Sequence, residues 1–193
     1  MIYIMSMNLG SIWSNTPIPE RPARPIQQTV NKPVNNIKRH VNQASTRSYW
    51  GTSVWFFFHT ISCRINASFY ASNYKYIWMF IKDVCGALPC PFCQKHAVEY
   101  VSRISIQQIN TKEKLKTVLF EFHNSVNSRI GKQIVGRNVL TKYNRANIKQ
   151  IFDLFERRFF HSYIGRRHFD DWIKNDFRKK FTNFFNIVRT KFD

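Results

Sequence analysis

The chain has 193 residues, 44% hydrophobic and 16% aromatic, which suits one domain with extensions and excludes a wholly disordered polypeptide. Four cysteines are too few for a disulfide-stapled scaffold, but they are enough for one redox or metal site. A formal net charge of +19 predicts a strongly basic surface, which favours contacts with nucleic acid, anionic membranes or phosphate-bearing ligands.

The first segment, residues 1–48, carries five of the seven prolines and has no helical or alternating apolar period. We expect it to be a flexible or extended arm. Its first residues lack the basic region and apolar length of a signal peptide. No stretch of the chain reaches the roughly 18 consecutive apolar residues of a membrane span. We therefore expect no secretory signal and no transmembrane segment. In a reducing compartment a CxxC motif is more often catalytic or metal-binding than structural.

From Trp50 onward, apolar residues recur at helical spacing in consecutive stretches. The first stretch is expected to end at Ser72-Asn73 and the second at Leu88-Pro89, because a residue before proline avoids the helical region. The third opens at Pro91, whose fixed φ suits a first helical position.

A fourth helix is expected to start at a capping box formed by Asn110 and Glu113 and to stop at Gly131 in the left-handed conformation. No stretch alternates at period two for long enough to predict a strand. The short loops predict an all-α fold, an up-and-down four-helix bundle.

Two further helical stretches follow, near residues 148–159 and 169–192. The second interleaves aromatic residues with Lys and Arg, as a basic amphipathic helix does. We expect its aromatic face to pack on the bundle; the alternative is a face for a membrane surface, nucleic acid or a partner protein. The chain thus divides into the arm 1–48, a domain 49–145 and a basic aromatic extension 146–193.

Cys90-Pro91-Phe92-Cys93 is a CxxC motif at an expected helix start. Cys90 would be the N-cap, where unsatisfied backbone N–H groups and the helix dipole favour a thiolate. The spacing also permits a reactive disulfide between the two sulfurs. A zinc site is the alternative, since Cys85, Cys90, Cys93 and His96 lie close together in sequence. From these residues alone, redox chemistry, zinc binding and inert buried thiols all stay open.

Two of the expected helices carry ring or amide side chains at a spacing of four. Trp55 and His59 share one helical face, and His123 and Asn127 share another. A bundle core that is flat, aromatic and able to form hydrogen bonds suits a planar heteroaromatic cofactor, with Lys132 near its phosphates.

Three motifs occur in order, at residues 50–59 (WGTSVWFFFH), 88–96 (LPCPFCQKH) and 123–132 (HNSVNSRIGK). Together they resemble the Erv/ALR family of FAD-linked sulfhydryl oxidases, over about residues 49–145. The resemblance implies a bundle of four helices plus a short fifth helix, with FAD held at the mouth of the bundle. It also implies oxidation of protein dithiols with O2 as final acceptor, usually by a homodimer.

The resemblance further implies roles for single residues. Cys90 looks like the solvent-side cysteine that takes electrons from the substrate, and Cys93 like the cysteine beside the flavin. Gly51 matches the glycine that lets the backbone approach the cofactor. The positions expected to line FAD are Gly51, Trp55, His59, His96, His123, Asn124, Val126, Asn127 and Lys132, and no metal is implied.

The chain also departs from many cellular members of that family. Phe120 stands three residues before His123, so the second, structural disulfide of those members is absent. The chain has no cysteine before Cys63 or after Cys93, so the distal shuttle pair of many relatives is missing as well. Cys63 and Cys85 are expected to be buried thiols. Such short members resemble those of large DNA viruses. A viral protein of this kind would act in the host cytoplasm or nucleus and in the virion, and a cellular one in the mitochondrial intermembrane space.

We therefore predict an FAD-dependent thiol oxidase that passes disulfides to a partner dithiol, such as a thioredoxin-like or virion protein, and gives hydrogen peroxide. Its basic surface is a further candidate contact for nucleic acid or anionic membrane. One alternative is a basic zinc- or nucleic-acid-binding virion protein that uses Cys85, Cys90, Cys93 and His96. Another is a redox-inactive Erv-like scaffold.

Overall fold

The computed structural model describes residues 37–163 and 171–193, with side chains from Tyr49 onward. Helices account for most of these residues; isolated bridge residues occur at Ile65, paired with Phe192, and at Ala146, and no strand occurs in the described ranges. The predicted all-α class is therefore confirmed. The elements are α1 (Ile37–Arg64), α2 (Ala67–Gly86), α3 (Pro91–Ser102), the 3₁₀ helix η1 (Ile106–Gln108), α4 (Lys112–Arg129), the 3₁₀ helix η2 (Arg137–Arg145), α5 (Ile148–His161) and α6 (Asp171–Val188).

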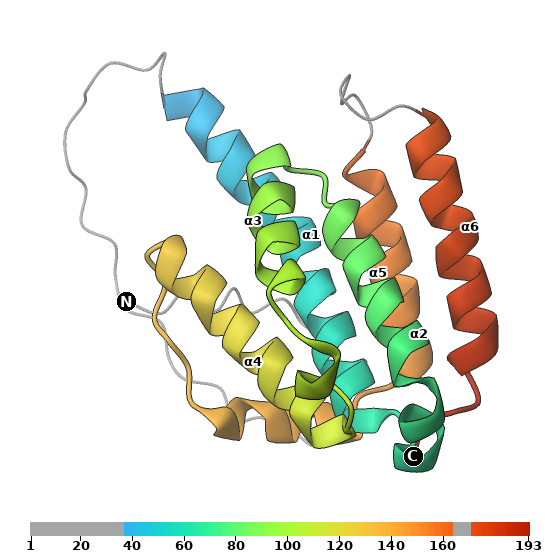
Figure 1. Ribbon diagram of the computed structural model, residues 1–193. Coiled ribbons are helices and arrows are strands. Elements are labelled where there is room, and N and C mark those ends of the chain that lie inside the picture. Colours follow the sequence, from blue (N-terminus) through green and yellow to red (C-terminus); the bar gives the residue numbers. More distant parts are fainter. Residues whose placement is uncertain (1–36, 164–170) are drawn as a thin grey trace.

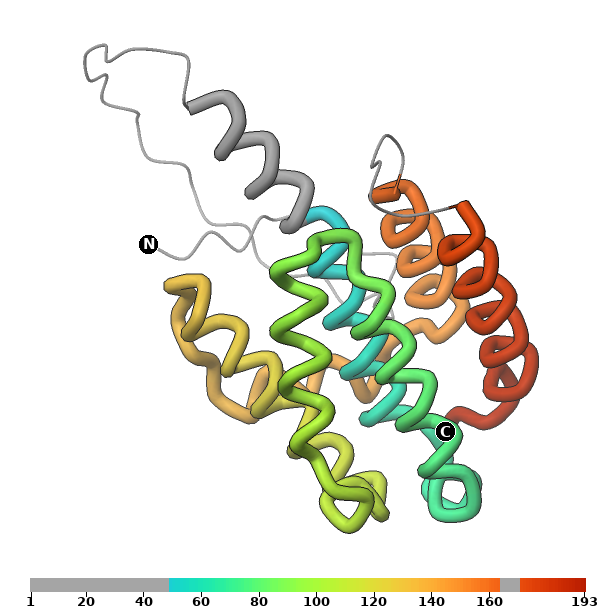
Figure 2. Tube along the Cα trace, turned by 45° about the horizontal axis from the view of Figure 1, so that its top comes forward, coloured from blue at the N-terminus to red at the C-terminus, as the bar shows by residue number. Residues whose placement is uncertain are grey.

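Helices α1 to α4 run up and down as a bundle, with α1 and α2 at its centre (Figure 1). Helix α1 packs against α4, η2 and α5, while α2 packs against α3, α4 and α6. Helices α5 and α6 thus lie on the side of α1 and α2 that faces away from α4, and the view in Figure 2 shows the same order.

Helix α1 begins at Ile37, inside the segment predicted to be a flexible or extended arm. The last part of that segment is therefore helical backbone, contrary to the prediction. The rest of the arm, residues 1–36, lies outside the described residues.

The break between α1 and α2 lies at Ile65 and Asn66, so the predicted break at Ser72-Asn73 is wrong. Asn66 caps α2, because its Oδ1 accepts hydrogen bonds from the N–H groups of Ser68 and Phe69 at 3.1 and 3.0 Å. Ser72 and Asn73 instead donate to the carbonyls of the preceding turn, at 3.4 and 2.9 Å. These bonds let both polar residues remain inside a helix.

The predicted N-cap of α3 is confirmed, and the predicted capping box of α4 is wrong. Cys90 is the N-cap of α3, with its Sγ 3.4 Å from the N–H of Cys93. Helix α4 is capped by Thr111, whose hydroxyl accepts from the N–H of Lys114 at 3.2 Å, and not by a box of Asn110 and Glu113. Asn110 Oδ1 accepts instead from Lys114 Nζ, at 2.9 Å. At the other end of α4, Gly131 has the predicted positive φ, +69°.

The aromatic face of α6 packs on the bundle, as predicted, and the aromatic face of α5 does so as well. Phe184 stacks on Phe80 of α2 with centroids 3.9 Å apart and planes within 7°, and Phe155 stacks on Phe57 of α1 at 4.5 Å. All four side chains are buried. Burying a phenylalanine stabilises a fold by about 1.5–3 kcal/mol, and aromatic pairing adds to that. The C-terminal extension and the bundle therefore share one hydrophobic core.

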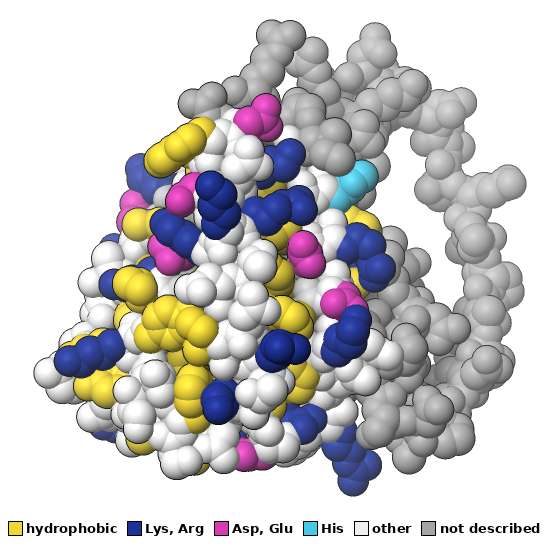
Figure 3. Space-filling view, turned by 90° about the vertical axis from the view of Figure 1, so that its right-hand side faces the viewer, with side chains coloured by type: hydrophobic (Ala, Val, Ile, Leu, Met, Phe, Trp, Pro, Cys, Tyr) yellow, Lys and Arg dark blue, Asp and Glu magenta, His cyan; other side chains and the backbone are white. Residues whose placement is uncertain are grey.

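The outer face of α6 carries both signs of charge (Figure 3). Lys180 lies 3.1 Å from Asp176 and 3.8 Å from Asp83, and Arg178 lies 3.9 Å from Glu156. The consecutive basic residues Arg178, Lys179 and Lys180 are exposed on this face, and two of the three, Arg178 and Lys180, lie beside acidic side chains. None of the helices in the described part of the chain is long and apolar enough to span a membrane.

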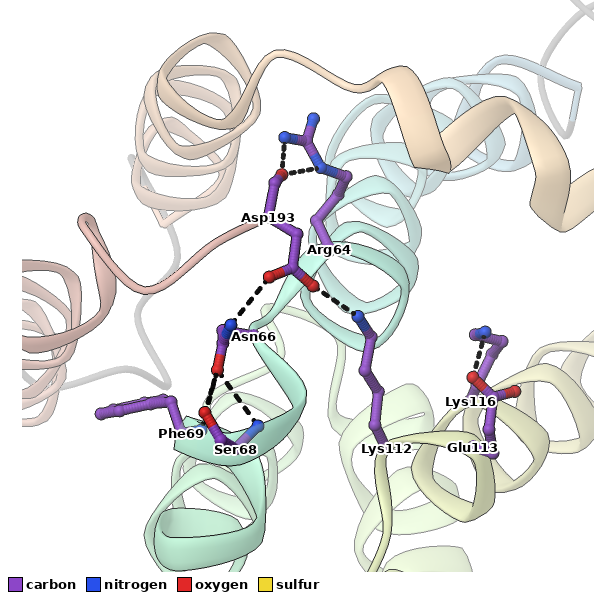
Figure 4. A network of polar contacts seen from close by, with 8 residues as sticks. All are labelled: Arg64, Asn66, Ser68, Phe69, Lys112, Glu113, Lys116 and Asp193. Carbon is purple, nitrogen blue, oxygen red and sulfur yellow. Dashed lines mark hydrogen bonds and ion pairs between the residues drawn. The ribbon is translucent and has the colours of Figure 1, made fainter.

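The C-terminal residues are tied to the turn between α1 and α2 (Figure 4). Arg64 Nε donates to the Asp193 carbonyl at 2.7 Å, Asn66 Nδ2 donates to the Asp193 carboxylate at 2.9 Å, and Lys112 Nζ lies 3.2 Å from it. The hydrogen bonds from Asn66 and Lys112 lower the pKa of Asp193. The tail thus joins the end of α6 to α1, α2 and α4. A cavity of about 450 Å³ lies beside this turn and includes none of the predicted site residues.

Candidate active site

The CxxC motif lies at the start of α3, at the same end of the bundle as the end of α2. Phe92, between the two cysteines, is 79% exposed, whereas Cys90 is only 8% exposed and Cys93 is half-buried. Cys90 is buried because its sulfur turns back over the first turn of α3 toward the N–H of Cys93. Cys93 is thus more exposed than Cys90, which is the reverse of the order expected for a solvent-side Cys90. The exposed fractions therefore do not support Cys90 as the cysteine that meets the substrate.

Trp55 and His59 of α1 meet His123 of α4. The rings of Trp55 and His123 are stacked, with centroids 4.1 Å apart and planes within 8°. Nε2 of His59 lies 2.9 Å from Nδ1 of His123, which is a hydrogen bond whose donor depends on the tautomer. The spacing of four on α1 places Trp55 and His59 on one face, and the packing of α1 on α4 brings that face to His123.

Both imidazoles of this cluster are held neutral. Burial lowers the pKa of His59 well below its usual 6.5, and His123 and Lys142 lower it further. Burial, with Lys142 and Lys132, lowers the pKa of His123 to about 4. A neutral pair has one donor and one acceptor nitrogen in the mutual bond. The other nitrogen of His59, Nδ1, is buried with no hydrogen-bond partner among the described residues.

Phe122 joins this cluster to α3. Its ring lies edge-on to Trp55 at 5.2 Å and stacks on Tyr100 at 4.4 Å, and the His96 ring lies 6.3 Å away. Partial burial lowers the pKa of His96, and the positive charge of Arg129 lowers it further. The helix that carries the CxxC motif therefore contacts the aromatic cluster through Phe122.

The predicted residues at the end of α4 shape the segment that follows it. Asn124 donates to the Val135 carbonyl at 3.0 Å and accepts from the Val135 N–H at 3.1 Å. The backbone carbonyl of Asn127, whose side chain is buried, accepts from the N–H of Lys132 at 2.8 Å. Val126 is half-buried against the core, and Lys132 is exposed. Asn124 thus holds the 131–136 segment in place.

Gly51 lies one turn before Trp55. A Cβ atom placed on it would meet no protein atom within 4 Å, so the packing of the chain itself does not require glycine there. The predicted close approach of a cofactor at Gly51 therefore stays a prediction.

The sequence reasoning missed Lys142 and Tyr143 of η2. The buried Tyr143 ring lies 5.0 Å from the His59 ring, and Lys142 Nζ lies 5.1 Å from the Tyr143 ring. Burial lowers the pKa of Lys142. A spacing of three between the buried Leu140 and Tyr143 is the sequence signal of this 3₁₀ helix, which a search at the α-helical period does not detect.

The proposed zinc ligands do not form a site. No group of three or more His, Cys, Asp or Glu side chains in the described part of the chain could hold a metal ion. Cys85 is 1% exposed in the core, where burial raises its pKa to about 12 and so disfavours a thiolate ligand. Cys63 and Cys85 are both buried free thiols, as predicted.

The cluster instead fits a flat heteroaromatic group such as a flavin. It offers the ring planes of Trp55 and His123, the unpartnered Nδ1 of His59, and the cations Lys132 and Lys142. Neutral imidazoles, indole rings and nearby positive charge are suitable partners for ring nitrogens, ring faces and phosphates respectively.

Comparison with known proteins agrees with these features. The model of the Erv1/Alr family matches residues 52–144. Protein 347L of Invertebrate iridescent virus 6 is 32% identical over 104 residues, which cover 48% of this chain and 89% of the relative. The FAD-linked sulfhydryl oxidase of African swine fever virus is 30% identical over 88 residues, covering 45% of this chain and 72% of that protein.

Some relatives are longer than the matched region. The match to protein 096R of Invertebrate iridescent virus 3 is 29% identical and covers 49% of this chain but 65% of the relative. No solved structure matched the chain. Since the match to 347L extends over most of that relative, and the family model covers residues 52–59 of the first motif and the whole of the other two, the chain belongs to the Erv1/Alr family.

Proposed function

We propose that this chain is an FAD-dependent thiol oxidase that converts two thiols and O2 into a disulfide and hydrogen peroxide. The observation that carries the proposal is the neutral Trp55–His59–His123 cluster, linked through Phe122 to the helix that starts with the CxxC motif. When bound, FAD supplies a two-electron acceptor that O2 can reoxidise.

The cysteine pair handles the exchange with the partner. A partner thiolate attacks one sulfur of the Cys90–Cys93 disulfide, which forms a mixed disulfide and releases the other sulfur as a thiolate. The partner's second thiolate then attacks the mixed disulfide. The partner leaves as a disulfide, and Cys90 and Cys93 hold the two electrons as thiols. By resemblance to the family, Cys90 receives the partner and Cys93 faces the flavin.

The remaining residues position the cofactor. The rings of the cofactor would be surrounded by Trp55, His59, His96, His123 and Asn127. Its phosphates would lie near Lys132. Gly51 and Val126 would line the site with backbone and apolar surface, and Asn124 would act by fixing the 131–136 segment.

The partner is a protein dithiol, and we propose a homodimer as the working unit. The viral sources of the relatives support a viral protein. We propose that it acts in the host cytoplasm or nucleus and in the virion.

The test uses the purified full chain. We expect it to be yellow, with one FAD per chain and no zinc by elemental analysis, and to consume O2 and release an equal amount of hydrogen peroxide with dithiothreitol. A Cys90→Ser/Cys93→Ser double variant should keep FAD and lose turnover. Colourless protein with bound zinc would overturn the proposal, and flavin without turnover in the unaltered chain would indicate a redox-inactive scaffold.

A further inference from the structure

The segment that leads into the CxxC motif is short and buried. Ala87, Leu88 and Pro89 separate the end of α2 from Cys90, and all three are buried. Because Cys90 is the N-cap of α3, the path of this segment sets where its sulfur lies relative to Cys93.

Two side chains donate hydrogen bonds to consecutive carbonyls where α2 ends and this segment begins. Gln94, next to Cys93 in α3, donates through Nε2 to the carbonyl of Gly86. Tyr163, which follows α5, donates through its hydroxyl to the carbonyl of Ala87. One donor therefore belongs to the CxxC helix, and the other belongs to the C-terminal extension.

Tyr163 is firmly held in this position. It is 5% exposed, and its ring lies against Phe159 at 5.6 Å. The end of α5 is itself fixed to α1, because Arg158 lies over the Tyr49 ring at 4.8 Å. Burial raises the pKa of Tyr163, so its hydroxyl keeps the proton that it donates.

We infer that Tyr163 is a positioning residue for the Cys90–Cys93 pair, acting through the Ala87 carbonyl to fix the segment that places Cys90. Tyr163 lies outside the region that matches the family, residues 52–144, so this contact comes from the chain's own extension. The redox role of the Cys90–Cys93 pair itself rests on the proposed function.

The chain offers a matched control for this contact. Tyr70 of α2 is also fully buried, and its hydroxyl also donates to a backbone carbonyl, that of Ile109. Ile109 precedes α4, at the end of the bundle away from the CxxC motif. Tyr163→Phe and Tyr70→Phe each remove one buried hydroxyl, but only the Tyr163 hydroxyl contacts the segment that leads into Cys90.

The experiment compares both variants with the unaltered chain, each loaded with FAD. We expect equal FAD content and similar small losses of melting temperature in the two variants. Only Tyr163→Phe should slow anaerobic flavin reduction by dithiothreitol, by about tenfold, because a displaced sulfur reacts from a poorer geometry. Only Tyr163→Phe should also shift the thiol–disulfide equilibrium of the CxxC pair against glutathione.

Equal reduction rates and equal glutathione equilibria in the two variants would overturn the inference. Gln94→Met removes the other donor to the segment at similar side-chain length, and it should slow reduction as well. If Tyr163→Phe does not fold, an unchanged rate in Gln94→Met overturns the inference instead. If dithiothreitol reduces no flavin in the unaltered chain, the proposed function itself has failed.

Discussion

The ring of Trp55 lies parallel to the ring of His123, with centroids 4.1 Å apart, although the two residues belong to different helices. His59 holds the same imidazole through a 2.9 Å hydrogen bond. The orientation of His123 is therefore set by α1 as much as by its own helix, and a change in any of the three side chains should disturb the other two.

Removing His123 should weaken flavin binding. His123→Ala deletes the stack on Trp55 and leaves His59 Nε2 without its partner, at a cost of about 1–3 kcal/mol. Asn127→Ala should act in the same direction by removing a buried amide. The measurement is the ratio of flavin to protein after dialysis. Exposed His161→Ala is the control, and full flavin in both site variants would remove these residues from the cofactor site.

Stability should fall in mild acid. The pKa of His123 is lowered from 6.5 to about 4, so between these values the unfolded chain binds a proton that the folded chain does not. The free energy of unfolding should therefore decrease as the pH drops from 6.5 toward 4, by on the order of 3 kcal/mol for this residue. His59, whose pKa is also lowered, adds to the loss.

Urea unfolding of the flavin-free chain at a series of pH values measures this dependence. The curve should become shallower in His123→Gln and stay unchanged in the exposed control His161→Gln. A free energy of unfolding that does not vary between pH 6.5 and 4 would contradict a buried neutral pair.

Replacing Asn124 should lower the stability of the fold. Asn124→Ala breaks both hydrogen bonds to Val135 and should destabilise the chain by about 1–3 kcal/mol, because two backbone groups lose their partner. Flavin content should fall with it, since the 131–136 segment carries Lys132. Asn183→Ala on the exposed face of α6 is the matched control, and equal urea midpoints for the two variants would refute this role.

The two cysteines of the CxxC motif should behave differently when they are replaced singly. On the proposed assignment, Cys90→Ser leaves the Cys93 thiolate beside oxidised flavin, and we expect a long-wavelength charge-transfer band above the thiol pKa. With Cys93→Ser, we expect no such band, and Cys90 should trap a partner as a mixed disulfide. The reverse pattern of bands would exchange the two roles, and turnover in both variants would show that another pair is active.

Much of the bundle and of the site was predictable from local patterns. Cys90 caps α3 as expected because Pro91 fixes the first helical position, and Gly131 ends α4 because it alone accepts a positive φ there without cost. Trp55 and His59 share one face of α1 as expected because a spacing of four fixes a helical face, whereas their contact with His123 depends on how α1 packs on α4.

The predictions failed where the local structure depends on a choice between neighbouring polar groups or on contacts with distant segments. Thr111 and Asn110 both suit a cap, and only the final packing selects the hydroxyl of Thr111. The order of exposure of Cys90 and Cys93 depends on the position of the Cys90 sulfur over the first turn of α3, which the motif alone does not give. Tyr163 reaches Ala87 from far along the chain, and no local pattern reports such a contact.

The stacking of Phe155 on Phe57 and of Phe184 on Phe80 limits how this protein can be shortened. The region shared with the family ends at residue 144, before α5 begins. A fragment cut there would present the aromatic flank of α1 and α2 directly to water, together with the Ala87 segment next to the cysteines. Such a patch promotes self-association, so a fragment that keeps the CxxC motif in a monodisperse protein should need α5 and α6 as well.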